Sequence, residues 1–370
     1  MNNKCFVFAG GGTGGHIYPA IAVAEQIVKL RPGAKIHFFC SSRTIDEQIL
    51  AQTDFEFTRL TATGFSVRPG KLISFCSSFL ASYRIAKEAI AKSKNVVVIG
   101  AGGFVSAPVC LASHKCKVPV GLLNVDIVPG RANKIISRWA DEIFVQFEET
   151  AQYFARRCGN VSIVGCPLRS GFENPEPDKA IGQLGLEKDK KTLLVTGASS
   201  GSENINRAVC SLLEKLDAFA DDWQIVHLAG VNNCEKVKGQ YDNAKISHKV
   251  LGYFDDMANL LAAADLVIGR SGAVSVAEFA AAGTPSICMP YPYHRDRHQY
   301  LNAGKLVEAG AAVIVDDLQD EKDRAEWLAE ELEELMKDHE KRQEMKRNCR
   351  AIAKKQASLK IAEKLIEISG

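Results

Sequence analysis

Short and almost uninterrupted apolar runs recur along the chain, separated by segments long enough to form a helix. The first series comprises Cys5–Ala9, Lys35–Cys40, Asn95–Gly100, Val118–Leu123, Glu142–Gln146 and Val161–Gly165. The second series comprises Thr192–Thr196, Gln224–Ala229, Lys249–Tyr253, Leu266–Gly269, Pro285–Pro290 and Ala311–Val315. Runs that are solid instead of alternating are typical of parallel strands covered on both faces. The pattern predicts an α/β protein with two doubly wound domains.

A polar segment, Gly165–Lys191, separates the two series and contains three prolines and a charged stretch. We expect it to be the linker, with domains at residues 1–164 and 165–345. The last segment, 346–370, is charged and helical in pattern. It places Ile361, Leu365 and Ile368 on one helix face, so we expect that helix to pack against the fold.

Composition and charge narrow the possible functions. The chain has 46 basic and 44 acidic side chains and a formal net charge of +2, which gives no general basis for binding nucleic acid. We find no leader and no apolar run long enough to span a membrane, so we expect a cytosolic protein. The 11 cysteines lack Cys-x-x-Cys spacing, and no His-Glu-x-x-His or Asp-x-Asp occurs. We therefore expect buried thiols and no tightly bound metal.

Two glycine-rich turns follow strand-like runs and precede helix-like segments. The first, Gly10–His16, has the geometry of an anion site at a helix start, and it ends in a histidine that can carry a proton. Its Gly-x-Gly-x-x-Gly spacing is also found in dinucleotide enzymes. The second run ends in Ser41-Ser42-Arg43, without the carboxylate that such enzymes use to bind ribose, which disfavours a nicotinamide enzyme.

The second turn, Gly197–Gly201, matches the Gly-x-Ser-x-Gly elbow of hydrolases. A hydrolase would use Ser199 as its nucleophile, but it would leave the first glycine turn without a function. We favour the alternative in which the Ser199 hydroxyl lies beside a phosphate.

The segment Arg270–Pro285 predicts a turn after a strand, then a helix that ends at the glycine and proline near its close. Ser271 and Gly272 can leave helix-start amides available for a pyrophosphate, and Glu278 can accept hydrogen bonds from the two hydroxyls of a ribose. The alternative is a capping box made by Ser275 and Glu278. A polar cluster, His294–Asn302, follows the next strand, and its amides and imidazoles suit a hydroxyl-rich ligand.

Four motifs, in order, resemble the MurG family of glycosyltransferases: Gly11–Pro19, Gly102–Pro108, Arg270–Glu278 and Asp296–Asn302. The resemblance spans nearly the whole chain. It implies a GT-B fold of two Rossmann-like domains facing a cleft, with a C-terminal helix returning to the first domain. It further implies inverting, metal-independent and cofactor-independent transfer of N-acetylglucosamine from UDP-N-acetylglucosamine to the C4 hydroxyl of a polyprenyl-pyrophosphate-linked muramoyl-pentapeptide, a step of peptidoglycan synthesis.

The resemblance also assigns roles to residues of each domain. The donor-binding residues in the second domain and the linker are Arg169, Ser199, Ser271, Gly272, Ala273, Glu278, His298, Gln299 and Asn302. The acceptor-binding residues in the first domain are Thr13, Gly14, Gly15, His16, Phe104, Asn124 and Asp126. Arg169 would steady the charge that develops on UDP, although an ordinary linker ion pair is the alternative.

This chain departs from the family pattern at three places. His298 stands where the family often has glutamine, and Phe104 where it often has tyrosine. Leu123-Asn124-Val125-Asp126 replaces His-Glu-Gln-Asn. The last two departures fall in the acceptor half, so a transferase with another lipid acceptor, or a relative that binds donor without turnover, stays an alternative.

Inverting transfer needs a base that takes the proton of the acceptor hydroxyl. His16 and Asp126 both qualify, and the sequence does not choose between them. The alternative role of His16 is to donate a hydrogen bond to a phosphate. The alternative role of Asp126 is to cap the helix that follows it.

The segment Phe65–Arg84 mixes bulky apolar side chains with cations, which suits an anionic membrane surface. We expect peripheral attachment to the cytoplasmic face of the plasma membrane. In the alternative, the helically spaced Leu72, Phe75, Phe79 and Tyr83 belong to the core.

Overall fold

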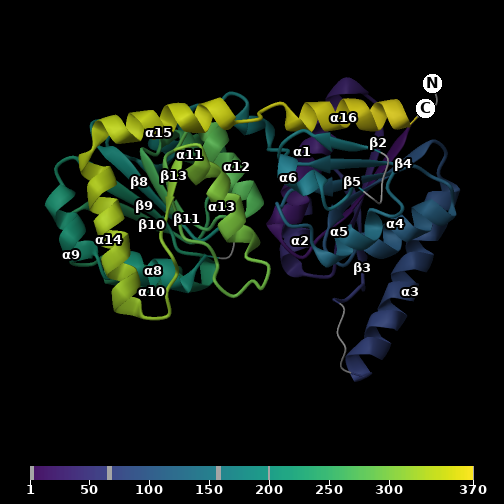
Figure 1. Ribbon diagram of the computed structural model, residues 1–370, viewed down its shortest axis with the longest axis horizontal. Coiled ribbons are helices and arrows are strands. Elements are labelled where there is room, and N and C mark those ends of the chain that lie inside the picture. The colour runs from purple at the N-terminus through teal and green to yellow at the C-terminus, as the bar shows by residue number, and fades with distance from the viewer. Residues whose placement is uncertain (1–3, 65–68, 156–159, 199–200, 370) are drawn as a thin grey trace. The chain divides into compact units, whose positions relative to one another are not determined.

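The computed structural model describes residues 4–64, 69–155, 160–198 and 201–369, which divide into two compact units. The first unit comprises Met1–Arg169 and Lys355–Gly370, and the second comprises Ser170–Lys354. Each unit is a parallel sheet covered by helices (Figure 1). The predicted α/β class with two doubly wound sheets is confirmed.

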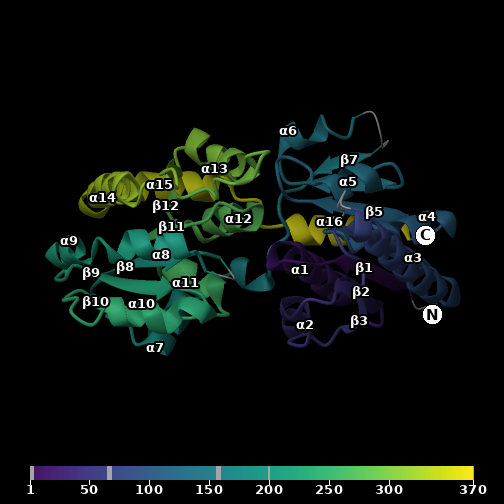
Figure 2. The same ribbon diagram turned by 90° about the horizontal axis from the view of Figure 1, so that it is seen from below.

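In the described part of the first unit, seven parallel strands follow the order β3-β2-β1-β4-β5-β6-β7 (Figure 2). Their bounds are β1 Cys5–Gly10, β2 Lys35–Ser41, β3 Glu56–Leu60, β4 Val96–Gly102, β5 Val120–Asn124, β6 Glu142–Val145 and β7 Val161–Ile163. The sequence pattern missed β3 because this edge strand carries the exposed Glu56 and Arg59 and has no solid apolar run.

Helices cover both faces of this sheet. Their bounds are α1 Gly14–Leu30, α2 Thr44–Leu50, α3 Pro69–Lys92, α4 Ser106–Lys115, α5 Arg131–Ile136, α6 Glu148–Ala151 and α16 Ala357–Ile368. On one face, α3, α4 and α5 contribute residues such as Ala86, Val109 and Ile136 to a buried cluster. On the other, α16 lies beside α1 and packs Leu365 against Gly121 of β5. The C-terminal helix therefore returns to the first unit, as expected.

In the described part of the second unit, six parallel strands follow the order β10-β9-β8-β11-β12-β13. Their bounds are β8 Lys191–Thr196, β9 Trp223–Leu228, β10 Ser247–Leu251, β11 Leu266–Gly269, β12 Ser286–Cys288 and β13 Ala312–Ile314. The α-helices are α7 Pro177–Leu184, α8 Glu203–Cys210, α9 Leu213–Leu216, α10 Cys234–Gln240, α11 Met257–Ala263, α12 Ala273–Ala282, α13 His298–Glu308, α14 Glu321–Lys337 and α15 His339–Ile352. Short 3₁₀ turns lie at Ser170–Phe172, Asp217–Phe219 and Val231–Asn233.

The segment predicted as a linker is partly structured. It contains α7, which packs against α11 within the second unit. The proline Pro177 occupies the first turn of α7, where a missing N–H costs nothing, so a proline that suggested a linker instead begins a helix.

Strand order reverses once in each sheet, between β1 and β4 and between β8 and β11. The loops after these strands leave the sheet at its carboxyl edge, where open α/β sheets bind ligands. Both glycine turns and the Arg270 segment begin at these positions.

Candidate functional site

The glycine turn of the first unit joins β1 to α1 and is tightly packed. Gly12 has φ +94°, a left-handed conformation that favours glycine. A Cβ on Gly103, in the loop after β4, would overlap the carbonyl of Gly11. The two loops at the strand-order reversal therefore touch backbone to backbone, which a larger residue would prevent.

The carboxylate of Asp46 in α2 is buried against this turn. It accepts the Gly12 N–H at 2.8 Å and 3.0 Å and the Ser41 N–H at 3.1 Å, and it also accepts the Ser41 hydroxyl. On the other side of Gly12, Arg43 Nη1 donates to its carbonyl at 2.7 Å. The sequence analysis did not identify Asp46, because hydrogen bonds between a side chain and a distant backbone leave no local pattern.

His16 lies in the first turn of α1, with its ring against Gly102 at the end of β4. Its Nδ1 lies 3.2 Å from the Gly11 carbonyl and 3.3 Å from the Thr13 hydroxyl. Burial lowers the pKa of His16, while the negative charge of Asp126 acts to raise it. The structure therefore brings the two candidate bases close enough to interact.

Asp126 is half-buried in the loop after β5. The N-cap of the following helix, α5, is Gly130, so the alternative in which Asp126 caps that helix is wrong. Asn124 is buried: its amide nitrogen donates to the Asp126 carbonyl at 2.7 Å and its oxygen accepts from Asn133 at 2.8 Å. Asn124 thus holds the backbone that carries Asp126.

The other predicted acceptor residues surround the same turn. Thr13 is exposed and is the N-cap of α1, but its side chain makes no capping bond. Gly14 is covered by the ring of Tyr18, and Gly15 is half-buried. Phe104 is half-buried, with the Arg43 guanidinium 5.8 Å from its ring centre.

Arg169, predicted to lie near the donor, is the last residue of the first unit. Its guanidinium lies over the Tyr18 ring at 4.7 Å from the ring centre. Arg169 is therefore packed on α1, one turn beyond the glycine turn.

The second unit contains a cavity of about 450 Å³ at the carboxyl ends of β8 and β11. Its lining comes from four loops and helix starts and comprises Gly197, Ala198, Gly201, Ser202, Glu203, Asn204, Arg270, Gly272, Ser275, Tyr291, Tyr293 and Gln299. The sequence analysis named Gly272 and Gln299 among these as ligand-binding residues. Ser199 lies outside the described residues.

Arg270 connects the walls of this cavity. It donates to the Met289 carbonyl at 2.8 Å and to the Ser202 hydroxyl at 2.8 Å. It also forms a buried ion pair with Asp317 at 2.7 Å. Asp317 in turn accepts from Asn204 at 2.9 Å and pairs with the buried Arg324 at 3.4 Å. The sequence analysis quoted Arg270 as part of a motif but missed this structural role.

The start of α12 faces the same cavity. Its N-cap is Gly272, which has no side chain to cap the helix, and Ala273 is the first helical residue. Ser275 therefore lies inside the helix, so the capping-box alternative for Ser275 and Glu278 is wrong. The Ser271 hydroxyl is buried and has no hydrogen-bond partner within the described residues. Glu278 is half-buried on α12.

The polar cluster after β12 makes contacts among its own members and with the neighbouring backbone at Tyr291 and Ser271. Gln299 Oε1 accepts the Tyr291 N–H at 2.9 Å, and Asn302 Nδ2 donates to the Ser271 carbonyl at 3.3 Å. His298 Nδ1 lies 2.7 Å from Asp296, and its ring stacks on His294 at 4.2 Å between centres. Burial would raise the pKa of Asp296, but the hydrogen bond and charge of His298 lower it overall. His298, Gln299 and Asn302 are thus brought together at the start of α13.

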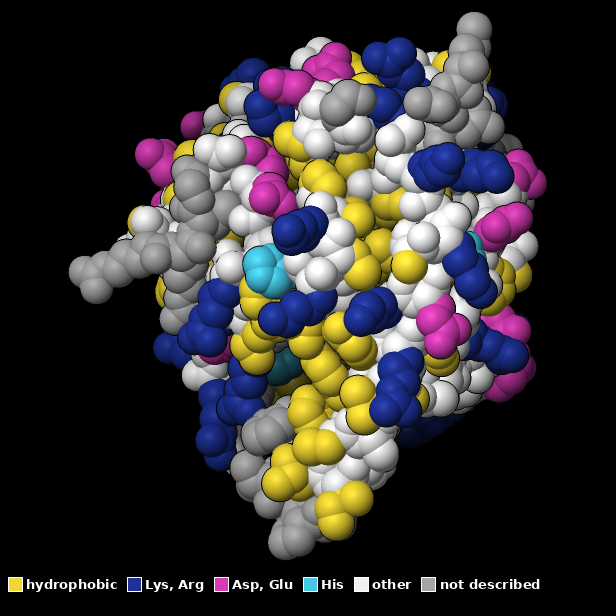
Figure 3. Space-filling view, turned by 90° about the vertical axis from the view of Figure 1, so that its right-hand side faces the viewer, with side chains coloured by type: hydrophobic (Ala, Val, Ile, Leu, Met, Phe, Trp, Pro, Cys, Tyr) yellow, Lys and Arg dark blue, Asp and Glu magenta, His cyan; other side chains and the backbone are white. Residues whose placement is uncertain are grey.

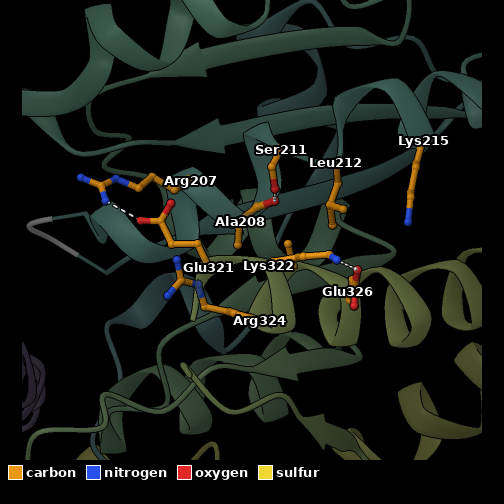
Figure 4. A pocket seen from close by; sticks show the side chains of 10 residues that line it. Arg207, Ala208, Ser211, Leu212, Lys215, Glu321, Lys322, Arg324 and Glu326 are labelled. Atoms are coloured by element: carbon orange, nitrogen blue, oxygen red, sulfur yellow. Dashed lines mark hydrogen bonds and ion pairs between the residues drawn. The ribbon is translucent and has the colours of Figure 1, made fainter. Parts of the chain in front are cut away.

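A second cavity in this unit, of about 340 Å³, lies between α8 and α14 (Figure 4). Two ion pairs lie in its lining, Arg207 with Glu321 at 2.6 Å and Lys322 with Glu326 at 3.7 Å. None of the predicted site residues lines it. Within the described ranges, no group of three or more His, Cys, Asp or Glu side chains lies close enough to hold a metal ion.

Solved structures share this fold. The structure of Acinetobacter baumannii MurG matches with a TM-score of 0.72 at 23% identity, covering 98% of this chain and 99% of that one. A protein from Listeria monocytogenes, named a putative UDP-N-acetylglucosamine 2-epimerase, matches with a TM-score of 0.70 at 15% identity, covering 98% of this chain and 95% of that one. At these identities the likeness shows the fold alone.

Sequence comparisons go further. Two curated proteins are each 34% identical to this chain. The one from Caldicellulosiruptor saccharolyticus matches over 96% of both chains, and the one from Halothermothrix orenii over 94% of both. Both are named UDP-N-acetylglucosamine--N-acetylmuramyl-(pentapeptide) pyrophosphoryl-undecaprenol N-acetylglucosamine transferase. The family models for the glycosyltransferase family 28 N-terminal and C-terminal domains match residues 6–145 and 192–365. The chain belongs to glycosyltransferase family 28.

Proposed function

We propose that this chain transfers N-acetylglucosamine from UDP-N-acetylglucosamine to the C4 hydroxyl of a muramoyl-pentapeptide carried on a polyprenyl diphosphate. The full-length similarity to relatives named for this reaction supports both substrates. The observation that carries the donor half is the cavity of about 450 Å³ at the reversal of strand order in the second unit.

The donor diphosphate suits the start of α12 and the glycine turn after β8. A helix start with a glycine N-cap presents backbone N–H groups and a partial positive charge to an anion. The unpartnered Ser271 hydroxyl can supply one more hydrogen bond. Glu278, two turns along α12, is the proposed ribose ligand, and the removal of its capping-box alternative supports this role.

The donor sugar is assigned to His298, Gln299 and Asn302. Gln299 uses its oxygen to hold the backbone of Tyr291, which leaves its amide nitrogen to donate to a sugar hydroxyl or carbonyl oxygen. Because its oxygen is already hydrogen-bonded, the Gln299 amide keeps one orientation. It can therefore bind the sugar without the entropic cost of ordering its side chain first.

We assign the role of general base to His16, with Asp126 as its electrostatic partner. Burial lowers the pKa of His16, so the ring is neutral near pH 7 and can accept a proton. The negative charge of Asp126 then stabilises the imidazolium that forms. The acceptor diphosphate is assigned to the amides of Gly14 and Gly15, because Asp46 already uses the amide of Gly12.

The leaving UDP gains negative charge as the glycosidic bond breaks. Backbone amides at the start of α12 are the groups proposed to stabilise it, which removes the need for a divalent cation.

We further propose that α3 attaches the protein to an anionic membrane surface. Leu72, Ile73 and Leu80 are exposed on this helix, with Ile73 at 73%, and Arg84 and Lys87 are exposed beside them. Figure 3 shows hydrophobic side chains gathered between Lys and Arg side chains toward the lower end of this face, where Figure 1 has α3. The core alternative is wrong for Leu72, while Tyr83 does pack against the core. Phe65 and Arg68 lie outside the described residues, and no described helix is both long and apolar enough to cross a membrane.

The test is UDP release measured with UDP-N-acetylglucosamine and a panel of acceptors, which includes the muramoyl-pentapeptide lipid and lipids with other head sugars. We expect release that depends on the muramoyl lipid. Release with another lipid alone would support a different acceptor, for which the altered Leu123–Asp126 segment gives a basis. Donor binding without release on any acceptor would support a non-catalytic relative. Labelling of Ser199 by a serine-hydrolase reagent, together with hydrolysis, would support a hydrolase.

A further inference from the structure

The buried carboxylate of Asp46 has no place in the chemistry described so far. It is fully buried in α2, and it accepts hydrogen bonds from the glycine turn and from the adjoining Ser41 at the end of β2. A Cβ on Gly11 would collide with it. A charge buried this deeply is costly unless it is well hydrogen-bonded, so the three donors it collects explain how it is tolerated.

Asp46 and Arg43 hydrogen-bond to the backbone N–H and the backbone carbonyl of one residue, Gly12. Asp46 accepts the Gly12 N–H, and Arg43 donates to the Gly12 carbonyl at 2.7 Å. The peptide units on either side of Gly12 are therefore fixed, at a φ of +94° that an unrestrained turn would leave readily. We call this arrangement the Gly12 clamp.

The clamp is connected to His16 through Gly11. The Gly11 carbonyl, directly before the clamped residue, lies 3.2 Å from His16 Nδ1. A carbonyl oxygen can only accept a hydrogen bond, so a neutral ring that bonds to the Gly11 carbonyl carries its proton on Nδ1 and its lone pair on Nε2, beside Gly102. A ring that instead accepts from the Thr13 hydroxyl, 3.3 Å from the same Nδ1, would carry its proton on Nε2.

We propose that Asp46 and Arg43 are positioning residues that hold the Gly11 carbonyl against His16 and so keep the lone pair of Nε2 available as the catalytic base. This inference rests on the proposed function for its catalytic consequence, but the tautomer of His16 can be measured without turnover. Asp46 does not touch substrate in this account and acts only through the turn.

Two charged groups act on His16 directly: Asp126, which follows β5, and Asp46 in α2. Arg43, the residue before α2, reaches the same turn and donates to the Gly12 carbonyl. The negative charge of Asp46 acts to raise the pKa of His16, as does that of Asp126. Removing the charge of Asp46 must therefore lower the His16 pKa further. If the substitution instead loosened the ring and exposed it to water, the His16 pKa would rise.

The experiment compares the full-length wild type with Asp46→Asn and Arg43→Gln. Long-range ¹H–¹⁵N NMR reads the tautomer and pKa of His16, and a His16→Gln variant assigns its signals. We expect Nδ1–H in the wild type and a mixture of tautomers in both variants. Because a misplaced reacting group costs on the order of 100-fold in rate, we expect kcat to fall about 10- to 100-fold in Asp46→Asn, with an unchanged KM for UDP-N-acetylglucosamine. We also expect the acid limb of the pH profile of kcat to lie at lower pH in Asp46→Asn than in the wild type.

The matched control is Glu47→Gln, which removes the neighbouring charge of α2, an exposed carboxylate paired with Arg59 at 2.8 Å. It leaves kcat and the tautomer unchanged. A wild-type ring protonated on Nε2, or unchanged kcat in both folded clamp variants, would overturn the proposal. If Asp46→Asn does not fold, kcat and the His16 tautomer of Arg43→Gln alone test the proposal, because Arg43 is exposed and its replacement should not prevent folding. If the wild type shows no transfer, the proposed function fails while the tautomer still tests the clamp.

Discussion

Replacing Arg270 by methionine removes the cation that joins four loops around the second-unit cavity. The guanidinium side chain is 10% exposed and the Asp317 side chain is 0% exposed. Breaking a buried pair by removing one partner typically costs about 3–5 kcal/mol, because the remaining charge is left uncompensated. Asp317 keeps its bonds to Asn204 and Arg324, so we expect the lower end of that range, about 3 kcal/mol.

The assay is urea unfolding in a Trp139→Phe background, which leaves Trp223 and Trp327 as reporters within the second unit. Trp223 is almost fully buried, so its emission follows the loss of that core. The matched control is Arg207→Met, an exposed arginine of α8 with two ion pairs, which we expect to leave the unfolding midpoint unchanged. UDP affinity, measured by calorimetry, should fall at least about tenfold in Arg270→Met alone, since about 1.4 kcal/mol suffices for that. Equal unfolding free energies for the two variants would refute the structural role of Arg270.

Four further predictions follow from the site. Glu278→Gln should raise the KM for UDP-N-acetylglucosamine about 10- to 100-fold, the effect of losing hydrogen bonds to a charged group, and an equal rise in the acceptor KM would argue against a ribose contact. The acid limb of the kcat/KM pH profile should lie below the ordinary histidine pKa of about 6.5, because burial lowers the pKa of His16. The rate is then full at about pH 7 and is lost as the pH falls through that lowered pKa. An acid limb above about 6.5 would argue against His16 as the base. Leu72→Ser with Ile73→Ser should weaken sedimentation with anionic vesicles, whereas Ile135→Ser with Ile163→Ser, also exposed hydrophobic residues of the first unit, should not. Equal binding by both double variants would remove the α3 proposal. Turnover should persist in excess chelator, and loss that magnesium restores would contradict a metal-independent mechanism.

Most of the fold could be predicted because buried parallel strands leave solid apolar runs in the sequence. The edge strand β3 could not, since its exposed Glu56 and Arg59 interrupt any such run. The boundary between the units, after Arg169, falls inside the predicted linker segment, but the helix α7 within it was not predicted, because a proline that ends one helix is equally suited to begin another.

Short motifs in the sequence were enough to place His16 at the glycine turn of the first unit and Gly272 and Gln299 beside the cavity of the second. It was not predictable where two distant segments meet. Asp46 contacts Gly12 across 34 positions, and Arg270 contacts Asp317 across 47. The capping-box pattern of Ser275 and Glu278 shows the converse case, because the spacing was present but the N-cap of the helix is Gly272, three residues before Ser275.

The most direct test of the central claim is the structure of the product made from UDP-N-acetylglucosamine and the muramoyl-pentapeptide lipid. Mass spectrometry and NMR of the isolated lipid should show one added N-acetylglucosamine on the C4 hydroxyl, in the β configuration that inversion of the donor's α linkage produces. A lipid recovered without the sugar while UDP is released, or an α-linked product, would contradict the account.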